Sequence, residues 1–254
     1  GDDVDLEDTY AFGWHEIRRL TDEMEAVAAQ LGAASIGEVA AQLDADPAMR
    51  LSSQELLPWL QGRVDDVTEA LDGVHFDLPA VARRAECRIA PATSGVMYYT
   101  PPDASFSRPG RVWWAPPVDG TSFAWREVTT VHHEAVPGHH LQISVAMAPE
   151  GVHPLQRSMA HVHGYVEGWA HYAERYAAEL GLLRPPGELL GMLFGQRWRA
   201  ARIVIDMGLH LDLPIPPDNG LTDASRWSWD VGVGVLRSAS GASASTASFE
   251  VDRY

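Results

Sequence analysis

The segment HHEAVPGHH at residues 132–140 places four histidines and one glutamate within nine residues, with a proline and a glycine between the two histidine pairs. Neutral imidazoles and carboxylates are the side chains that hold a catalytic zinc ion, and one further carboxylate is needed to move protons. Pro137 lacks an N–H donor and collides with the carbonyl of His133, four residues earlier, while Gly138 relaxes the backbone. We therefore expect a helix through this segment to kink between the histidine pairs.

The histidine spacing differs from the HExxH arrangement, in which two histidines four residues apart reach one ion from the same helix face. Here the histidines that follow His133 are His139 and His140, six and seven positions on. In an unbroken helix His139 lies about 120° off the face of His133, and His140 shares that face but lies about 10 Å further along the axis. A kink can bring His139 back, so the spacing is compatible with a metal site without proving one. Glu134 is the candidate general base.

Composition narrows the classes of partner. The chain has 254 residues, 46% of them hydrophobic, which indicates a folded globular protein. Its formal net charge is −16 and it contains no lysine, so neither nucleic acid nor an anionic membrane is an expected partner. Cys87 is the single cysteine, which excludes an internal disulfide framework and a cysteine-based zinc site. The sequence opens with no signal-peptide pattern and has no run of about 20 apolar residues, which favours the cytoplasm while leaving a trimmed N-terminus open.

Apolar periodicity predicts a mainly α (α+β) chain. Between about residues 84 and 116 the runs CRIA, GVMYYT and RVWWAP are β-prone and separated by proline and glycine, so we expect a small antiparallel sheet there. The low-complexity stretch 238–248 is expected to be a loop. The predicted domains are an N-terminal helical region over 1–80 and a metal-binding core over 81–254. Helices are expected at about 6–31, 36–44, 53–72, 125–147, 156–180, 187–211 and 223–237.

A second acidic and histidine-rich segment, HGYVEGWAHYAE at 163–174, supplies further candidates. Glu167 is either a third metal ligand or a solvated glutamate that pairs with a histidine four residues away. His171 shares its helix face and is the rival ligand. Glu174, two turns beyond Glu167, either orients a ligand imidazole or pairs with a nearby arginine. His132 is expected to support the site from behind or to be exposed.

The predicted helix over 187–211 carries charged residues in a segment that is otherwise apolar. Arg202, Asp206 and His210 recur at four-residue spacing and so share one stripe, which is either part of a cleft or a solvated face. The aromatic residues Trp113 and Trp114 are either strand packing or a wall for substrate.

Three ordered motifs carry a resemblance that covers most of the chain. HEAVPGHHLQ (133–142), EGWAHYAE (167–174) and RAARIVIDMGLH (199–210) resemble the Domain of Unknown Function 885 family, bacterial proteins regarded as gluzincin-like zinc metallopeptidases. MYYTPP (97–102) and RPG (108–110) fit the same pattern.

The resemblance implies a mostly helical fold with a small sheet beside the zinc-binding helix. It implies that His133, His139 and Glu167 bind zinc, that Glu134 is the base, and that the stripe of Arg202, Asp206 and His210 lines or braces the site. It also implies an edge strand along the cleft, here the RVWWA run, that offers backbone hydrogen bonds to an extended peptide. Members are usually about twice as long, so we expect this chain to be a fragment, truncated at its C-terminus, or a reduced form.

The expected function is a zinc-dependent hydrolase that acts on a peptide or a small amide, with Glu134 as the proton shuttle and His210 or Tyr99 as the donor to the oxyanion. His140, Arg202, Asp206, Glu174 and Trp113 are expected to bind substrate or support the ligands. Two alternatives stay open. One is a non-catalytic metal protein, with a closed site that adds His171 or His140. The other is a zinc hydrolase that acts on a lactone or a non-peptide amide.

Overall fold

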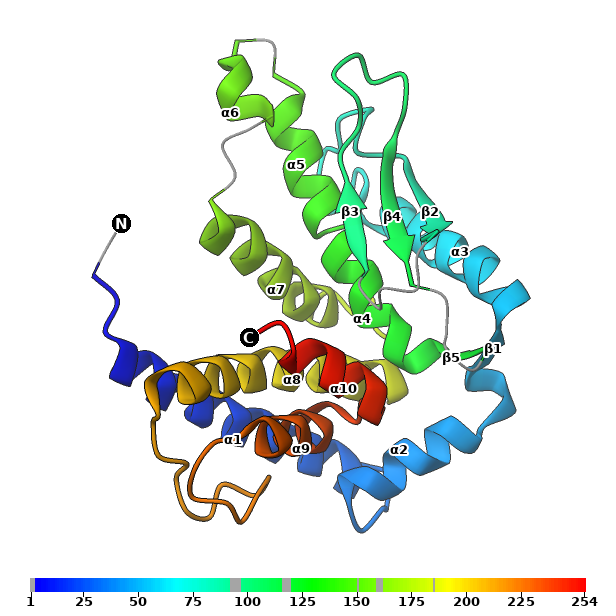
Figure 1. The fold of residues 1–254 in the computed structure, drawn as a ribbon. Coiled ribbons are helices and arrows are strands. Elements are labelled where there is room, and N and C mark those ends of the chain that lie inside the picture. Colours follow the sequence, from blue (N-terminus) through cyan, green and yellow to red (C-terminus); the bar gives the residue numbers. More distant parts are fainter. Residues whose placement is uncertain (1–2, 92–96, 116–119, 150, 159–161, 185) are drawn as a thin grey trace. The chain divides into compact units, whose positions relative to one another are not determined.

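The computed structural model describes residues 3–91, 97–115, 120–149, 151–158, 162–184 and 186–254, and over these residues the chain is mainly helical with two small sheets (Figure 1). The expected α+β composition is therefore confirmed. None of the helices within these ranges has the length and apolarity needed to cross a bilayer. The helices are α1 (Leu6–Gln30), α2 (Ile36–Ala45), the short 3-10 helix η1 (Pro47–Met49), α3 (Ser53–Leu71), α4 (Ala124–Glu134), α5 (His139–Met147), α6 (Pro154–Ser158), α7 (His163–Glu179), α8 (Gly187–Leu211), α9 (Trp229–Ser240) and α10 (Ala244–Val251). The strands are β1 (Arg50–Ser52), β2 (Ala85–Ile89), β3 (Tyr98–Thr100), β4 (Gly110–Trp114) and β5 (Thr121–Phe123).

Local capping explains where the helix predictions hold and where they fail. Helix α3 begins as expected because Ser52 and Glu55 form a capping box. The expected loop over 238–248 is wrong at both ends, since α9 continues to Ser240 and the Ser243 hydroxyl accepts a hydrogen bond from the Thr246 N–H and starts α10. Helix α9 begins later than predicted, after Ser228, whose hydroxyl caps the amide of Val231.

The chain divides into two compact units, which differ from the predicted division at residue 80. Unit 1 comprises Gly1–Gln42 and Leu193–Tyr254, and unit 2 comprises Leu43–Met192. The first helix belongs with the C-terminal helices because of long-range aromatic contacts. The Tyr10 hydroxyl donates to the carbonyl of Pro214, and Trp14 stacks on Trp227 with ring centroids 6.1 Å apart.

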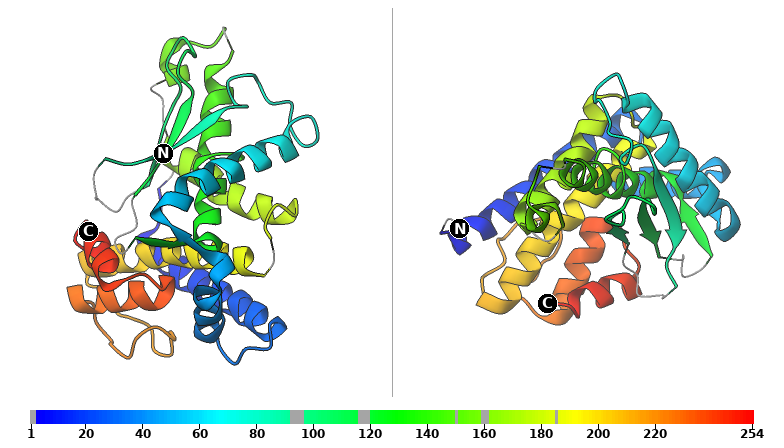
Figure 2. Two further views of the ribbon diagram at one scale, coloured as in Figure 1. Left: turned by 90° about the vertical axis from the view of Figure 1, so that its right-hand side faces the viewer. Right: turned by 90° about the horizontal axis from the view of Figure 1, so that it is seen from above.

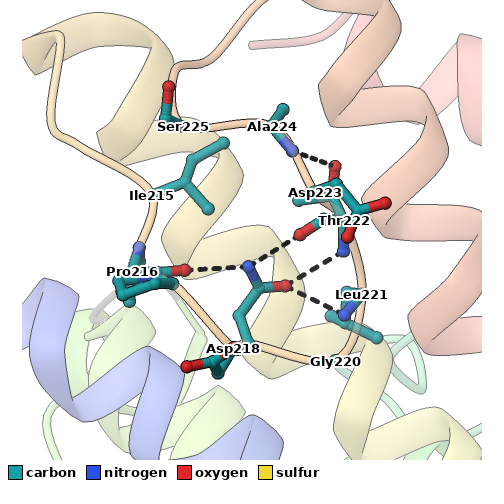
Figure 3. Close-up of a pocket in the computed structure, with 11 residues that line it drawn as sticks. Ile215, Pro216, Asp218, Gly220, Leu221, Thr222, Asp223, Ala224 and Ser225 are labelled. Atoms are coloured by element: carbon teal, nitrogen blue, oxygen red, sulfur yellow. Dashed lines mark hydrogen bonds between the residues drawn. The ribbon is translucent and has the colours of Figure 1, made fainter.

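In unit 1, the part of α8 from Leu193 onward lies beside α9 (Figure 2). The two helices pack closely at Gly232, where an added Cβ would lie 3.2 Å from the Ile205 side chain. The loop 215–225 between these helices surrounds a hollow (Figure 3). Hydrogen bonds of the Asn219 side chain hold this loop together. The Asn219 amide group donates to the carbonyls of Pro216 and Thr222, and its oxygen accepts from the backbone amides of Leu221 and Thr222. No histidine or cysteine lines this hollow, so it offers no imidazole or thiolate to a metal.

The main sheet of unit 2 has the strand order β2-β4-β3 (Figure 1). Strand β4 pairs with β2 in parallel and with β3 in antiparallel orientation. The prediction of an antiparallel sheet is therefore wrong for the β2–β4 pair. A parallel pair needs a long crossover connection, and the segment that contains β3 provides it. The prediction that the RVWWA run is an edge strand is also wrong, because β4 is central and both of its edges are paired.

One face of this sheet covers α3 and α4. Val112 and Trp114 of β4 are buried with Leu56 and Leu60 of α3 and with Val131 of α4. The alternation of buried and partly exposed residues along β4 puts Arg111 and Trp113 on the opposite face. This packing fixes α4, which carries the HHE sequence, beneath the sheet.

Candidate metal centre

The helix through HHEAVPGHH is interrupted, as predicted. Helix α4 ends at Glu134 and α5 begins at His139, so Ala135–Gly138 form a linker. Pro137 has no N–H to offer to the carbonyl of His133, and the backbone of Gly138 lies against that carbonyl. A Cβ at Gly138 would lie 1.9 Å from the His133 oxygen and 2.4 Å from the His132 oxygen. The linker therefore requires glycine at this position.

This interruption brings His139 back to His133. Their ring centroids are 4.8 Å apart and the rings are nearly perpendicular, at 87°. Ligand-capable atoms of His133, Glu134 and His139 all lie within 4.8 Å of one another. All three side chains are largely buried, with residue exposures of 6%, 9% and 7%.

Glu167, from α7, is the fourth side chain of the group. Its carboxylate oxygens lie 3.4 Å from Nε2 of His133 and 3.7 Å from Nε2 of His139. Ligand atoms at about 2.1 Å from one tetrahedral ion are about 3.4 Å from each other, so these separations suit a shared zinc ion. Hydrogen bonds from His133 and then from His139 hold the pKa of the Glu167 carboxyl well below its usual range. Its side chain is 60% exposed, which leaves the group open on this side.

Glu174 contacts the ring of His133 on the side away from Glu167. This agrees with the first of the two predicted roles of Glu174, that of orienting an imidazole. Its carboxylate is fully buried and lies 2.8 Å from Nδ1 of His133. Nδ1 of His133 can donate its proton to this carboxylate, and with zinc bound the lone pair of Nε2 would be free for the ion. Helix α7 approaches α4 closely because the residues it buries beside Glu174 are the small Ala170, Ala173 and Ala177.

His140 points away from the cluster, which distinguishes it from His139. Its Nε2 lies 3.1 Å from the carbonyl of Ala82, and its Nδ1 lies 2.8 Å from the hydroxyl of Tyr99. The carbonyl accepts the Nε2 proton, so the Tyr99 hydroxyl donates to Nδ1. Both nitrogens of His140 are thus used, and the geometry does not support His140 as a ligand. Because the Tyr99 hydroxyl already donates its proton to His140, it is not available to donate to an oxyanion, which argues against Tyr99 in that role.

His132 and His140 are fully buried, and burial lowers the pKa of each to about 4. The unfolded chain binds these protons from about pH 6.5 downward and the folded chain does not, so folding stability is lost as the pH falls from about 6.5 toward 4. At pH 5 we expect the free energy of unfolding to fall by about 2 kcal/mol for each histidine. Urea unfolding of zinc-free protein at pH 7 and pH 5 measures this loss, and His132→Gln should reduce it. An unchanged pH dependence in that variant would contradict the assignment.

The other predicted residues have contacts of their own among the described residues. Trp113 stacks on Tyr98, with centroids 5.9 Å apart, and donates its indole N–H to Thr100, so cross-strand packing accounts for it. Arg202, Asp206 and His210 belong to unit 1. There Arg202 donates to the Tyr254 hydroxyl, and His210 pairs with Asp206 at 3.0 Å. Their roles at the site stay predictions.

Trp169 is a supporting residue that the sequence reading missed. Its indole N–H donates to the carbonyl of Pro137 at 2.8 Å and so holds the linker between α4 and α5. It lies two residues after Glu167, within the EGWAHYAE motif, which was the available signal. The Ala82 carbonyl, which fixes His140, could not be predicted from the sequence, because every residue has a backbone carbonyl that can accept a hydrogen bond.

Comparison with known proteins gives a family and two similar structures. The model of the family described as "Bacterial protein of unknown function (DUF885)" matches residues 1–254. A putative lipoprotein from Colwellia psychrerythraea has a solved structure that is 26% identical, with a TM-score of 0.85, over 100% of this chain and 43% of that one. A putative lipoprotein of unknown function from Shewanella oneidensis is 16% identical, with a TM-score of 0.66, over 98% of this chain and 46% of that one, and shows the fold alone. The chain thus spans less than half the length of either protein. None of the curated proteins matches it.

Proposed function

This chain belongs to the DUF885 family of bacterial proteins, and from the geometry of its histidine cluster we propose that it is a zinc-dependent hydrolase that cleaves peptide bonds. One observation carries the proposal. The Glu167 carboxylate lies against Nε2 of both His133 and His139, with Glu134 within the same group. Two imidazoles, one carboxylate ligand and one further carboxylate form the donor set of a catalytic zinc site.

The residues present fit a catalytic zinc site, which keeps an open position, better than they fit a closed structural zinc site. His133, His139 and Glu167 would hold the ion, and a bound zinc ion supplies Lewis-acid activation of water and of a carbonyl group. A structural site uses four protein ligands, whereas His140 has both nitrogens engaged elsewhere. The exposed side of Glu167 leaves room for water and substrate.

Glu134 is the residue proposed to move the proton. It follows His133 directly at the end of α4, and its carboxylate belongs to the cluster. In the proposed reaction Glu134 accepts a proton from the attacking water as the new C–O bond forms. It then gives that proton to the leaving amine nitrogen as the C–N bond breaks. Glu174 keeps the proton of His133 on Nδ1 throughout.

The proposed substrate is an extended peptide that adds to strand β3. Since β4 is central, β3 is an edge of the sheet, and its residue Tyr99 contacts His140, the neighbour of His139. An edge strand offers backbone donors and acceptors to a peptide regardless of side chains. In this proposal the peptide binds one strand away from the RVWWA run that the resemblance suggested.

Zinc content tests the ligand assignment. We expect about one zinc per chain in the purified protein and loss of zinc in both His133→Ala and Glu167→Ala, because each change removes one of three protein ligands. Elemental analysis after removal of loosely bound metal measures this. Glu179→Ala is the matched control, since Glu179 is an exposed glutamate at the end of the same helix. Full zinc retention in both ligand variants would refute the site.

The cellular location is also open to proposal. The similar proteins from Colwellia psychrerythraea and Shewanella oneidensis are described as putative lipoproteins, which favours a lipid-anchored form of the complete protein. The sequence by itself favours the cytoplasm. Fractionation of cells that produce the complete protein distinguishes the two locations.

A further inference from the structure

The two histidines of the proposed site are supported differently. His133 donates from Nδ1 to the buried carboxylate of Glu174, which fixes its ring directly. Nδ1 of His139 is buried and has no hydrogen-bond partner among the residues that the structure describes. A ligand imidazole usually donates its second N–H to a carboxylate, a carbonyl or water. The direction of the His139 ring is therefore not fixed by a hydrogen bond at Nδ1.

The neighbouring His140 is held at both nitrogens. Its ring bridges the Tyr99 hydroxyl of β3 and the Ala82 carbonyl, and none of its surface is exposed. The backbone of Gly110 lies directly against this bridge. A Cβ at Gly110 of β4 would lie 2.3 Å from the Tyr99 hydroxyl oxygen and 2.5 Å from Nδ1 of His140. The bridge thus ties the start of α5 to the sheet.

We propose that the Tyr99–His140–Ala82 bridge positions His139 for zinc, an inference that rests on the proposed function. His139 and His140 are the first two residues of α5, so a side chain fixed at His140 fixes the rotation of this helical turn. An imidazole Nε2 lies about 6 to 7 Å from the helix axis, so a rotation of about 20° moves it by about 2 Å. A zinc–nitrogen bond tolerates only about 0.2 Å. Tyr99 and His140 are positioning residues in this view, because neither touches the ion.

Tyr99→Phe tests the bridge, because it keeps the ring and removes only the hydroxyl donor. We expect the dissociation constant for zinc, measured by competition with a chromophoric chelator, to rise about 10- to 100-fold. The d–d absorption of the cobalt-substituted protein should change as well, because the geometry of the ligands is altered. Tyr98→Phe is the matched control, since it removes the hydroxyl of an exposed tyrosine on the same strand, whose ring stacks on Trp113. That control should leave zinc affinity unchanged.

The outcomes separate this inference from the proposed function. If the wild type binds no zinc, the proposed function fails. If the wild type binds zinc and Tyr99→Phe binds it within about twofold, with an unchanged cobalt spectrum, the bridge has only a structural role and the inference is overturned. Should Tyr99→Phe not fold, His140→Phe applies the same test, because it keeps a planar ring and removes both nitrogens that form the bridge.

Discussion

Glu134→Gln should retain zinc and lose peptide hydrolysis. The amide is nearly isosteric with the carboxylate, and His133, His139 and Glu167 stay unchanged, so metal content should equal that of the wild type. An amide cannot accept the proton of the attacking water, and general-base catalysis contributes about 10²- to 10⁴-fold. We therefore expect kcat/KM to fall by at least two orders of magnitude.

The assay uses a mixed peptide library, on this chain and on a form extended toward the length of the solved relatives, of which it spans less than half. Glu179→Gln on α7 is the control for the loss of one carboxylate. Loss of metal from Glu134→Gln would make Glu134 a ligand and the mechanism wrong. If neither wild-type form cleaves any peptide, the site belongs to another hydrolase or to a metal-binding scaffold.

Much of the fold follows from local sequence rules. Helix α8 begins and ends where periodicity predicts, because its apolar residues recur at helical spacing over 25 residues. The sheet topology does not follow from such rules. The run around Val112 is β-prone in any topology, and its central place depends on pairing with β2, which lies more than 20 residues earlier. Strand pairing of this kind depends on tertiary contacts, which a short stretch of sequence does not reveal.

The residues of the candidate site were easier to predict than the sheet, since the proposed ligands lie in two short motifs. Chemistry alone left His139 and His140 as alternatives, because an ideal helix does not describe the linker between α4 and α5. The structure distinguishes them by partners far away in sequence. His140 bonds to Tyr99 and Ala82, whereas His139 faces Glu167.

Gly138→Ala should damage both folding and metal binding. The added methyl carbon would meet the backbone oxygens of His133 and His132 at 1.9 Å and 2.4 Å, and backbone atoms cannot move aside as a flexible side chain can. Overpacking in a tight interior usually costs about 1–3 kcal/mol, and contact with backbone puts this change at or above the upper end. Relief of the clash requires α5 to move relative to α4, which carries His139 away from His133. We expect zinc affinity to fall together with stability.

Chelator competition and urea unfolding of the zinc-free variant measure the two effects. Gly62→Ala in α3 is the control, because a Cβ there meets no atom within 4 Å and alanine favours a helix over glycine. That control should keep its zinc affinity and should not lose stability. If Gly138→Ala binds zinc as the wild type does, the close approach of Gly138 to the His133 carbonyl does not set the ligand geometry. His139 would then have to be oriented through the Tyr99–His140–Ala82 bridge alone.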